Sequence, residues 1–288
     1  MKAIYERELK SYFDSMTGYV FVAFVTMFMG IYFMANNMIG GYPYFSYTLS
    51  ALIMILMIAV PVLTMRSMSE ERRSRTDQLL LTSPVSLWSI VGGKYLSMVT
   101  VFAIPMLVAC LCPLVIKANG TAYLAGDYAS ILTFFLLGCT YISIGMFISS
   151  LTESQLIAAA GTFGILLLLI LWPDLLSFLP TTAQGSAVGL FLLWSLFAFL
   201  IYRLTSCLPL AAGLEAAGAA VLAAVYIFKE SMLDRALVRL LETIALEDVF
   251  DSVVYSHVLD LGGLLYYASF IGVMLFLTVQ TIERRRWT

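Results

Sequence analysis

Apolar runs close to 20 residues long recur along this chain, and short polar stretches separate them. An α-helix needs about 20 apolar residues to cross the hydrocarbon core of a bilayer. Because lipid offers the backbone no hydrogen-bond partners, a crossing segment must pair its own N–H and C=O groups, as a helix does. The runs predict an all-α polytopic membrane protein with about eight spans, at about 18–35, 48–65, 95–116, 130–150, 155–172, 186–202, 208–228 and 262–280.

The composition supports this interpretation. The chain is 61% hydrophobic and 12% charged, whereas soluble domains carry about 25% charged residues. This number of charged residues is too small to cover the surface of such an apolar chain. Lipid must therefore be the solvent for much of that surface. The formal net charge of -2 gives no reason to expect a nucleic-acid partner.

Residues 1–16 have the pattern of a helix that lies on the membrane surface. Aromatic and aliphatic side chains recur at helical spacing, and charged side chains fill the other face. An amphipathic helix of this kind beside a span belongs in the interface plane. The candidate residues of this N-terminal interface helix are Tyr5, Glu6, Leu9, Tyr12 and Phe13.

The polar segment 66–94 is the longest charge-dense interruption in the first 180 residues. We expect 66–81 to extend the second span as a solvated helix, because charges of both signs stand at close helical spacing. Ser83 before Pro84 predicts a helix cap and a first helical residue, followed by a second short helix over 84–93. Two interpretations are open: a solvated loop whose arginines only fix topology, or an element that a separate motor protein pushes.

Two later segments carry local signals. Thr152 and Gln155 have the spacing of a capping box, which predicts that the fifth span starts there and forms a tight hairpin with the fourth. The segment 229–260 begins with the pattern of an amphipathic helix outside the membrane. The residues expected on the apolar face of that helix are Met232, Ala236, Leu240 and Ile244.

The distribution of lysine and arginine predicts the orientation. Cytoplasmic loops carry an excess of these residues. With the N-terminus in the cytoplasm and eight spans, 12 basic residues face in and 4 face out. Both termini are then cytoplasmic. A six-span arrangement that lacks the pair over 186–228 has the same parity, so the count does not separate the two.

No catalytic or metal-binding pattern emerges. The single histidine, His257, is expected at the surface, and the four cysteines form no C-x-x-C pair and are expected to be small buried hydrophobes. Gly92, Gly93 and Lys94 lack the upstream glycine and the following Ser or Thr of a phosphate loop. We therefore expect no catalytic residue, no metal site and no cofactor bound by this chain.

Glu215 is the one acid well inside a predicted span. An intramembrane carboxylate is a candidate functional residue, for instance a proton site. The alternative is that Glu215 lies close enough to the cytoplasmic end of a small-residue helix to reach water or bond to a neighbour. Both interpretations remain open.

Four stretches resemble ABC-2 type transporter permeases, particularly the gliding-motility-associated branch. They are EERRSRTDQLLLTSPVSLWSIVGGKYLS from Glu70, MKAIYERELKSYFDSMTGYV from Met1, ISSLTESQLIAAAGTFGILLLL from Ile148 and DLGGLLYYASFIGVMLFLTVQTIERRRW from Asp260. The resemblance covers roughly 1–173 and 249–288. It implies a single permease domain over 1–288, with a six-helix core and a transmembrane hairpin inserted within 174–248.

The resemblance also implies the partners. Permeases of this family form homodimers or heterodimers and pair with a separate ABC ATPase subunit, which carries the ATP and Mg. The polar segment 66–94 would then be a cytoplasmic coupling loop. Its implied ATPase contacts are Glu70, Glu71, Arg72, Arg73, Arg75, Asp77, Gln78, Leu79 and Leu80.

These observations together predict a transport subunit that is not itself an enzyme. Its expected role is the permease of an ATP-binding-cassette exporter that moves an unidentified substrate across the bacterial cytoplasmic membrane. A proton-coupled secondary transporter using Glu215 and a non-transporting membrane scaffold are the alternatives.

Overall fold

The computed structural model describes residues 1–74, 86–205, 213–216, 218–220, 226 and 233–286. The described residues are mostly helical and include no strand, which confirms the all-α fold. The chain divides into two compact units. Unit 1 comprises Met1–Leu169 and Leu246–Thr288, and unit 2 comprises Ile170–Ala245.

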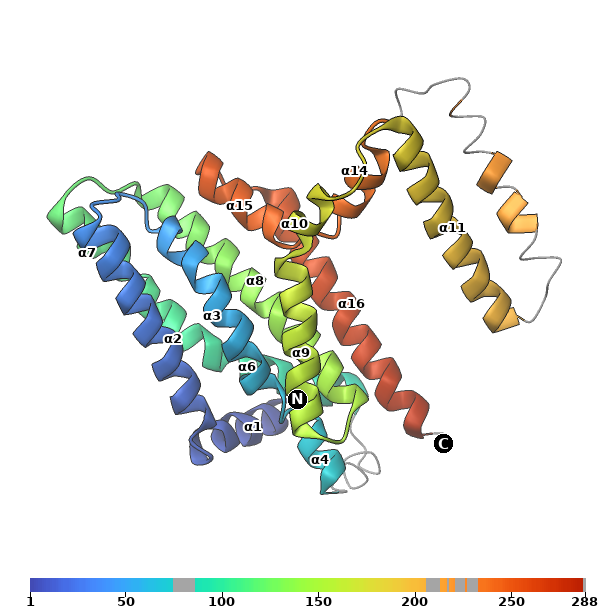
Figure 1. Ribbon diagram of the computed structural model, residues 1–288. Coiled ribbons are helices and arrows are strands. Elements are labelled where there is room, and N and C mark those ends of the chain that lie inside the picture. Colours follow the sequence, from blue (N-terminus) through green and yellow to red (C-terminus); the bar gives the residue numbers. More distant parts are fainter. Residues whose placement is uncertain (75–85, 206–212, 217, 221–225, 227–232, 287–288) are drawn as a thin grey trace. The chain divides into compact units, whose positions relative to one another are not determined.

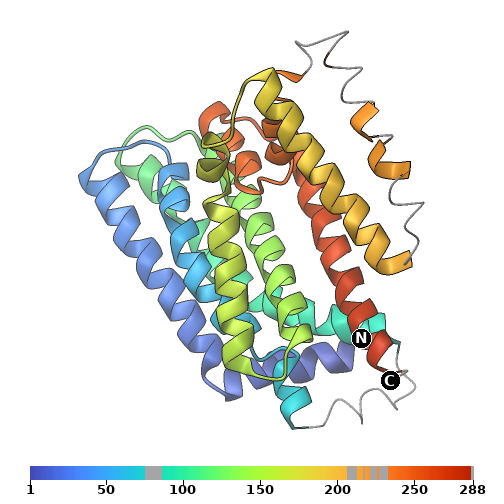
Figure 2. The same ribbon diagram turned by 45° about the vertical axis from the view of Figure 1, so that its right-hand side comes forward.

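Unit 1 is a bundle in which long helices run side by side (Figures 1 and 2). A short helix, α1, crosses one end of the bundle, and another, α15, lies at the opposite end (Figure 1). Its helices are α1 (Lys2–Asp14), α2 (Thr17–Phe33), the π-helix η1 (Met34–Ile39), α3 (Ser46–Thr64), α4 (Ser69–Arg73), α6 (Leu87–Ala109), α7 (Cys112–Asn119), α8 (Leu124–Leu151), α9 (Gln155–Ile170), α15 (Glu247–Ser256) and α16 (Leu261–Arg286).

Helix α8 is the centre of this bundle. It packs against α3, α6, α15 and α16, and most of its residues are buried. Small residues permit this close packing, because a Cβ atom on Gly138 would overlap the ring of Phe102 and one on Gly145 would overlap Thr64. Glycine at such contacts lets helix backbones approach within a membrane, where packing replaces the hydrophobic effect as the driving force.

Six described helices are long and apolar enough to cross a membrane. They are Thr17–Ile39, Ser46–Arg73, Leu87–Asn119, Leu124–Leu151, Ala183–Arg203 and Leu261–Arg284. The predicted fifth span corresponds to α9, which is shorter at 16 residues. Of the predicted span over 208–228, the structure describes only 213–216, 218–220 and 226. The chain is therefore a multi-pass membrane protein.

The third span differs from its predicted boundaries. We expected a separate short helix over 84–93, but α6 begins at Leu87 and runs without a break to Ala109. Ser86, whose Oγ accepts the Ser89 N–H at 3.4 Å, caps its first turn. The predicted cap at Ser83 and Pro84 lies outside the described residues. The helix continues through Pro105 and ends at Ala109, before the predicted limit of the span at about 116.

The hairpin between the fourth and fifth spans is confirmed, but its predicted capping box is wrong. Only Thr152–Ser154 separate α8 from α9. Helix α9 starts at Gln155, so Thr152 lies too far ahead of it to cap it, and the Thr152 hydroxyl donates to the Ser154 carbonyl at 3.0 Å. The Ser154 carbonyl itself accepts the Ala158 N–H, which makes Ser154 the residue preceding the first turn.

Unit 2 contains α10 (Trp172–Ser177), α11 (Ala183–Thr205) and α14 (Ala236–Glu242). The predicted apolar face of its amphipathic helix is wrong. Leu240 and Ile244 are exposed, whereas Leu237 and Val238 are the buried residues of α14. Arg235 has a left-handed backbone at the start of α14, and this interrupts the helical phase assumed from Met232 onwards. Met232 lies outside the described residues.

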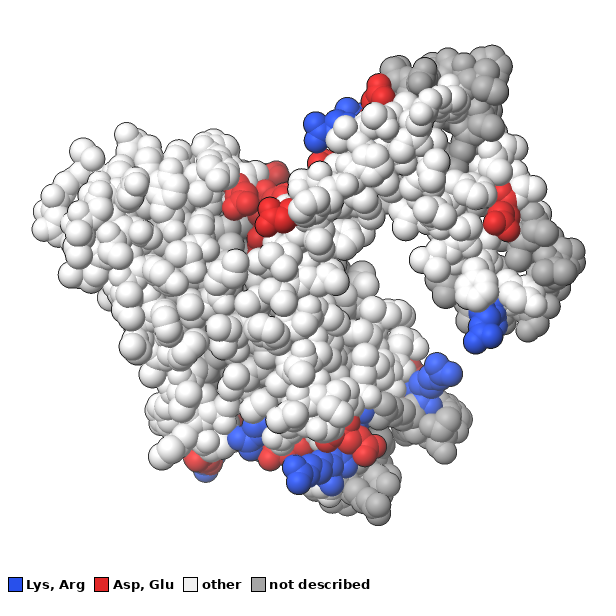
Figure 3. Space-filling model, viewed as in Figure 1, with Lys and Arg blue, Asp and Glu red and all other residues white. Residues whose placement is uncertain are grey.

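Charged side chains of unit 1 gather at its two ends. On the face drawn in Figure 3, blue and red residues cover the end formed by α1 and α4, and red residues cover α15. The surface between them on that face is free of charge. A charge-free band between two charged ends is what a bilayer requires of a spanning bundle.

Candidate functional site

The end of unit 1 crossed by α1 carries the densest polar network of the described residues. Helix α1 joins α2 at a sharp corner, where Met16 has a left-handed backbone with φ 60°. Two tyrosines fasten α1 to the bundle. The Tyr12 hydroxyl donates to the Leu63 carbonyl of α3 at 3.2 Å, and Tyr5 shares a 3.0 Å hydrogen bond with Thr100 of α6.

Gly92 and Gly93 form the surface of α6 on which α1 rests. A Cβ atom on Gly93 would lie 3.2 Å from Ile4, and one on Gly92 would lie 3.1 Å from Met1. Such distances are close to the limit for real side chains, so the missing Cβ atoms allow α1 to approach α6 directly. These two glycines therefore serve helix packing.

Lys94 follows these glycines and is buried, with a side chain 3% exposed. Its ammonium group lies 2.9 Å from the Glu71 carboxylate and 3.2 Å from the Glu8 carboxylate. It also donates to the Ser67 carbonyl at 2.9 Å. Each partner belongs to a different part of the chain, so one lysine on α6 joins α1, α4 and the turn between α3 and α4.

Arg7 completes this group. Its Nη2 atom lies 2.6 Å from Glu8 and 3.0 Å from Glu71. The hydrogen bond that Arg7 donates to the Glu8 carboxylate raises the pKa of the Arg7 guanidinium. Two cations and two carboxylates give the group no net charge. Lys94 is buried whereas Arg7 is 55% exposed, and a buried charge such as that of Lys94 is tolerable only when it is paired and hydrogen-bonded. We call Arg7, Glu8, Glu71 and Lys94 the four-charge cluster.

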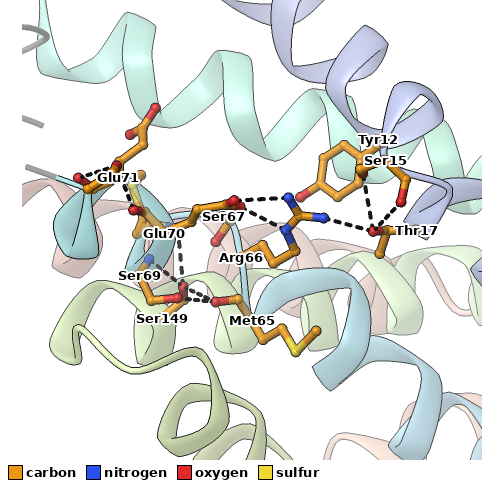
Figure 4. Close-up of polar contacts among 12 residues, drawn as sticks. Tyr12, Ser15, Thr17, Met65, Arg66, Ser67, Ser69, Glu70, Glu71 and Ser149 are labelled. Carbon is orange, nitrogen blue, oxygen red and sulfur yellow. Dashed lines mark hydrogen bonds and ion pairs between the residues drawn. The ribbon is translucent and has the colours of Figure 1, made fainter. Parts of the chain in front are cut away.

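A second ionic contact holds the α1–α2 corner. Arg66 forms two hydrogen bonds with Glu70, at 2.7 and 3.0 Å, and a third with the Thr17 hydroxyl at 3.0 Å. Figure 4 shows the guanidinium between the Glu70 carboxylate and Thr17. Because Thr17 is the first residue of α2, this contact ties α4 to the corner at which α1 turns into the bundle.

Ser149 connects the same region to the central helix. Its hydroxyl accepts the backbone N–H groups of Met68 and Ser69, both at 3.2 Å, and donates to the Met65 carbonyl at 3.1 Å (Figure 4). Met68 precedes α4 and Ser69 is its first residue, so neither N–H group has a helical partner of its own. A single side chain of α8 thus satisfies the backbone where α3 passes into α4.

The contacts at this end of unit 1 join five helices of the bundle. Helices α1, α2, α4, α6 and α8 are joined by charge-assisted and buried hydrogen bonds, which are the stronger kinds in proteins. No group of three or more histidine, cysteine or acidic residues within the described ranges could hold a metal. A displacement of α4 would therefore be passed to α1, α6 and α8.

The structure describes four of the nine residues predicted as ATPase contacts. Glu70 pairs with Arg66, Glu71 belongs to the four-charge cluster, Arg72 is half-buried and Arg73 is exposed. The remaining five, Arg75, Asp77, Gln78, Leu79 and Leu80, lie outside the described residues. Contact with an ATPase remains a prediction for all nine.

The predicted interface helix is present as α1. Tyr12 is buried, Leu9 and Phe13 are half-buried, and Phe13 packs edge-on against Tyr19 with ring centroids 5.1 Å apart. Tyr5 bonds to α6, as described above. Glu6 is exposed and lies 3.7 Å from Lys2. Part of the aromatic face of α1 therefore packs on the bundle.

Sequence reasoning missed Glu8, Lys94 and Ser149. A signal for Lys94 was present, because it is the sole charged residue between 79 and 116. A lone charge within a long apolar helix marks a buried partner or a functional site. Glu8 stands in a helix full of charges, and Ser149 is one of many small polar residues in α8, so neither stands out by its type or its neighbours.

Glu215 lies in the described segment 213–216 of unit 2, where its side chain is exposed. Of the cysteines, Cys139 is buried as expected, and Cys110 and Cys112 are half-buried. Cys207 lies outside the described residues. These positions assign no role to Glu215, which stays a candidate.

Comparison with known proteins found one similarity. A family model described as ABC-2 family transporter protein matches residues 2–205. The match contains the whole four-charge cluster and Ser149, and it continues through α11 into the region that we treated as an insert. It does not include α16. Comparisons with curated proteins and with solved structures found no match.

Proposed function

We propose that this chain, which belongs to the ABC-2 transporter family, is the permease subunit of an exporter. The expected role of a member of this family is the permease component of an ABC transporter. We place it in the gliding-motility-associated branch that its sequence resembles. ATP is hydrolysed by a separate ATPase subunit that binds Mg, and a second permease chain, identical or different, completes the membrane part. The substrate is unidentified.

The four-charge cluster is the observation that carries this proposal. A permease without its own ATP site needs a rigid connection between the surface that meets the ATPase and the helices that line the path of the substrate. Lys94 supplies such a connection, because it is buried in α6 and holds Glu8 of α1 and Glu71 of α4 together. A push on α4 then moves α1 and α6 with it.

The position of α4 supports its role as the receiving element. Helix α4 ends at Arg73, and the remaining predicted ATPase contacts follow shortly after it in the chain, at Arg75, Asp77, Gln78, Leu79 and Leu80. Arg73 itself is exposed. Ser149 fastens the start of α4 to α8, the most buried long helix. Force received beside α4 thus has a short route into the core of unit 1.

The charge distribution supports the proposed orientation. The end formed by α1 and α4 carries Lys2, Arg7, Lys10, Arg66 and Arg73, among the 12 basic residues counted on the cytoplasmic side. The positive-inside rule places such an end in the cytoplasm. We therefore propose a bacterial cytoplasmic membrane protein with both termini in the cytoplasm, where the ATPase is.

The test is reconstitution with a candidate ABC ATPase subunit from the same cell. We expect the two proteins to co-purify, and the ATPase in nanodiscs to hydrolyse ATP at a rate that depends on the permease. A permease variant with Arg73→Glu should weaken the complex. An ATPase whose turnover and binding are indifferent to this chain would overturn the proposal and favour a non-transporting role.

A further inference from the structure

A polar pocket opens at the end of unit 1 opposite α1, where α7 lies (Figure 1). It is formed between the segment that follows α2 and the end of α7, and its volume is about 270 Å³. All of the described residues that line it are uncharged, and they include Asn37, Met38, Tyr42, Asn119, Gly120 and Thr121. We call this end of unit 1 the distal end and this cavity the distal pocket.

One wall of the distal pocket comes from η1, the π-helix that continues α2. A π-helix is rare and occurs frequently at functional sites. Asn37 of η1 is buried, and its amide nitrogen donates to the carbonyls of Tyr42 and Tyr44 at 2.9 and 3.0 Å. The Thr48 hydroxyl donates to its amide oxygen at 2.7 Å. Asn37 therefore holds the segment 42–44 in a fixed position beside the pocket.

The opposite wall is the end of α7, which offers hydrogen-bonding groups that the protein itself does not use. The last four carbonyls of a helix have no partner within it, and no backbone N–H of a described residue caps those of α7. A Cβ atom on Gly120, the next residue, would meet nothing within 4 Å. Within the described part of the chain, the side-chain oxygen of Asn119 and the hydroxyl of Thr121 form no hydrogen bond. Both side chains are exposed, so these groups are open to a ligand.

An exposed aromatic pair lies beside these polar groups. Tyr42, which lines the distal pocket, is 54% exposed, and its ring packs against that of Tyr47 with centroids 5.5 Å apart. Tyrosine is common at the boundary between membrane and water, so exposure alone does not indicate a ligand. Tyr42 differs because it stands in a pocket whose opposite wall carries unused hydrogen-bonding groups.

The lining selects a class of ligand. A charged ligand would find no charged partner in the pocket, and burying an unpaired charge is costly. A purely apolar ligand would leave Asn119, Thr121 and the α7 carbonyls without partners. A neutral ligand with several hydroxyl groups and one C–H face satisfies both walls, because hydroxyls donate to carbonyls and a C–H face packs on an aromatic ring. A sugar ring has this composition, and the volume of the pocket, just below the range of about 300–1,000 Å³ for drug-sized ligands, suits a single ring.

We propose that the distal pocket binds one neutral sugar ring. The carbonyls at the end of α7, Asn119 and Thr121 bond to its hydroxyl groups, and Tyr42 packs on its C–H face. With the orientation proposed above, the pocket opens on the outer side of the membrane. The ring belongs either to a soluble glycan or to the headgroup of a glycolipid in the outer leaflet, because both present the same chemistry. Binding requires neither the four-charge cluster nor an ATPase.

A labelling experiment tests the site without the ATPase. We would introduce Thr121→Cys into the full-length chain with its four native cysteines changed to alanine, and label the protein in nanodiscs with a membrane-impermeant maleimide. Glucose, mannose and N-acetylglucosamine are the soluble probes, and at least one should slow the labelling in a saturable way. Ser252→Cys is the matched control, because Ser252 is exposed on α15 and does not line the pocket. Its labelling should not respond to the sugars.

Two comparisons test the chemistry of the pocket. Glucuronate, which adds a negative charge to the same ring, should protect Thr121→Cys less than glucose does. Adding Tyr42→Ala should raise the sugar concentration for half-maximal protection roughly tenfold, because the ring loses its aromatic partner. Adding Tyr255→Ala is the control, since Tyr255 is 77% exposed and lies on α15, outside the pocket. Both tyrosine variants should keep the melting temperature, because both side chains are exposed.

The lipid composition of the nanodiscs decides the source of the ring. Protection by glucosyl diacylglycerol in the nanodisc, but by no soluble sugar, supports a glycolipid headgroup, whereas protection by soluble sugars supports a soluble glycan. Absence of protection by every probe, equal protection by glucuronate and glucose, or unchanged protection with Tyr42→Ala would rule out the sugar site. None of these results depends on the ATPase, so failure of the sugar site and failure of the proposed function are distinguishable.

Discussion

The ammonium group of Lys94 lies 2.9 Å from the Oε1 atom of Glu71, and the same oxygen lies 3.0 Å from Arg7. This one carboxylate oxygen on α4 therefore connects Lys94 of α6 with Arg7 of α1. Because the charges share partners, the effects of substitutions within the four-charge cluster should be strongly non-additive.

Replacing Lys94 should be severe. Lys94→Met removes a buried cation and leaves Glu8 and Glu71 with Arg7 alone, so we expect a loss of about 3–5 kcal/mol in the free energy of unfolding. Thermal unfolding in detergent would measure it. Lys2→Met is the matched control, since Lys2 is 88% exposed and exposed pairs contribute little. Equal melting temperatures for the two variants would contradict the role assigned to Lys94.

Ser149→Ala should destabilise the junction between α3 and α4. The substitution leaves the Met68 and Ser69 N–H groups without their acceptor, and a buried unsatisfied group costs about 1–3 kcal/mol. Ser269→Ala is the control, because Ser269 is exposed and bonds only to the Tyr266 carbonyl of its own helix. Hydrogen exchange at 65–73 should rise in the first variant only.

Gly145→Ala should separate α3 from α8. The new Cβ atom would overlap Thr64, and overpacking of this kind costs about 1–3 kcal/mol. Gly30→Ala, in the interior of α2, meets no atom within 4 Å. It should stabilise by roughly 0.5–1 kcal/mol, because alanine favours the helix over glycine. Opposite shifts in melting temperature are expected, and shifts of the same sign would refute the packing argument.

Arg73→Glu should weaken binding of the ATPase without changing the melting temperature. Arg73 is exposed at the end of α4. Reversing its charge therefore changes the electrostatic potential that a partner meets and breaks no buried contact. Lys117→Glu is the matched control, because Lys117 is exposed on α7, on the side predicted to face out. Affinity of the ATPase for nanodisc-embedded permease, measured at several salt concentrations, would distinguish them.

The spans were predictable because lipid imposes one strong condition on sequence. Runs such as 130–150 and 262–280 are recognisable from length and apolarity alone, and α8 and α16 cover them. The sharp turn after Leu151 was also predictable. Its capping residue was not, because Thr152 and Ser154 are both preferred cap types and the backbone geometry decides between them.

The four-charge cluster was not predictable for a different reason. Charges near the end of a span usually mark the membrane boundary, so Lys94 was counted as a topological signal. Its burial depends on α1 folding back over Gly92 and Gly93, which is a tertiary contact. The error in α14 has a local origin, since the left-handed backbone at Arg235 resets the helical phase.

The three residues between α8 and α9 also constrain how the protein is made. They reach at most about 10 Å, far less than the roughly 30 Å of hydrocarbon that separates the two sides of the membrane. We therefore expect both helices to enter the bilayer together as a hairpin, helped by the absence of any charged residue from α9. A reporter protein fused after Leu151 would separate α8 from α9 and prevent them from inserting as one hairpin. The side of the membrane on which the reporter lies would then describe an incomplete chain and not the finished protein.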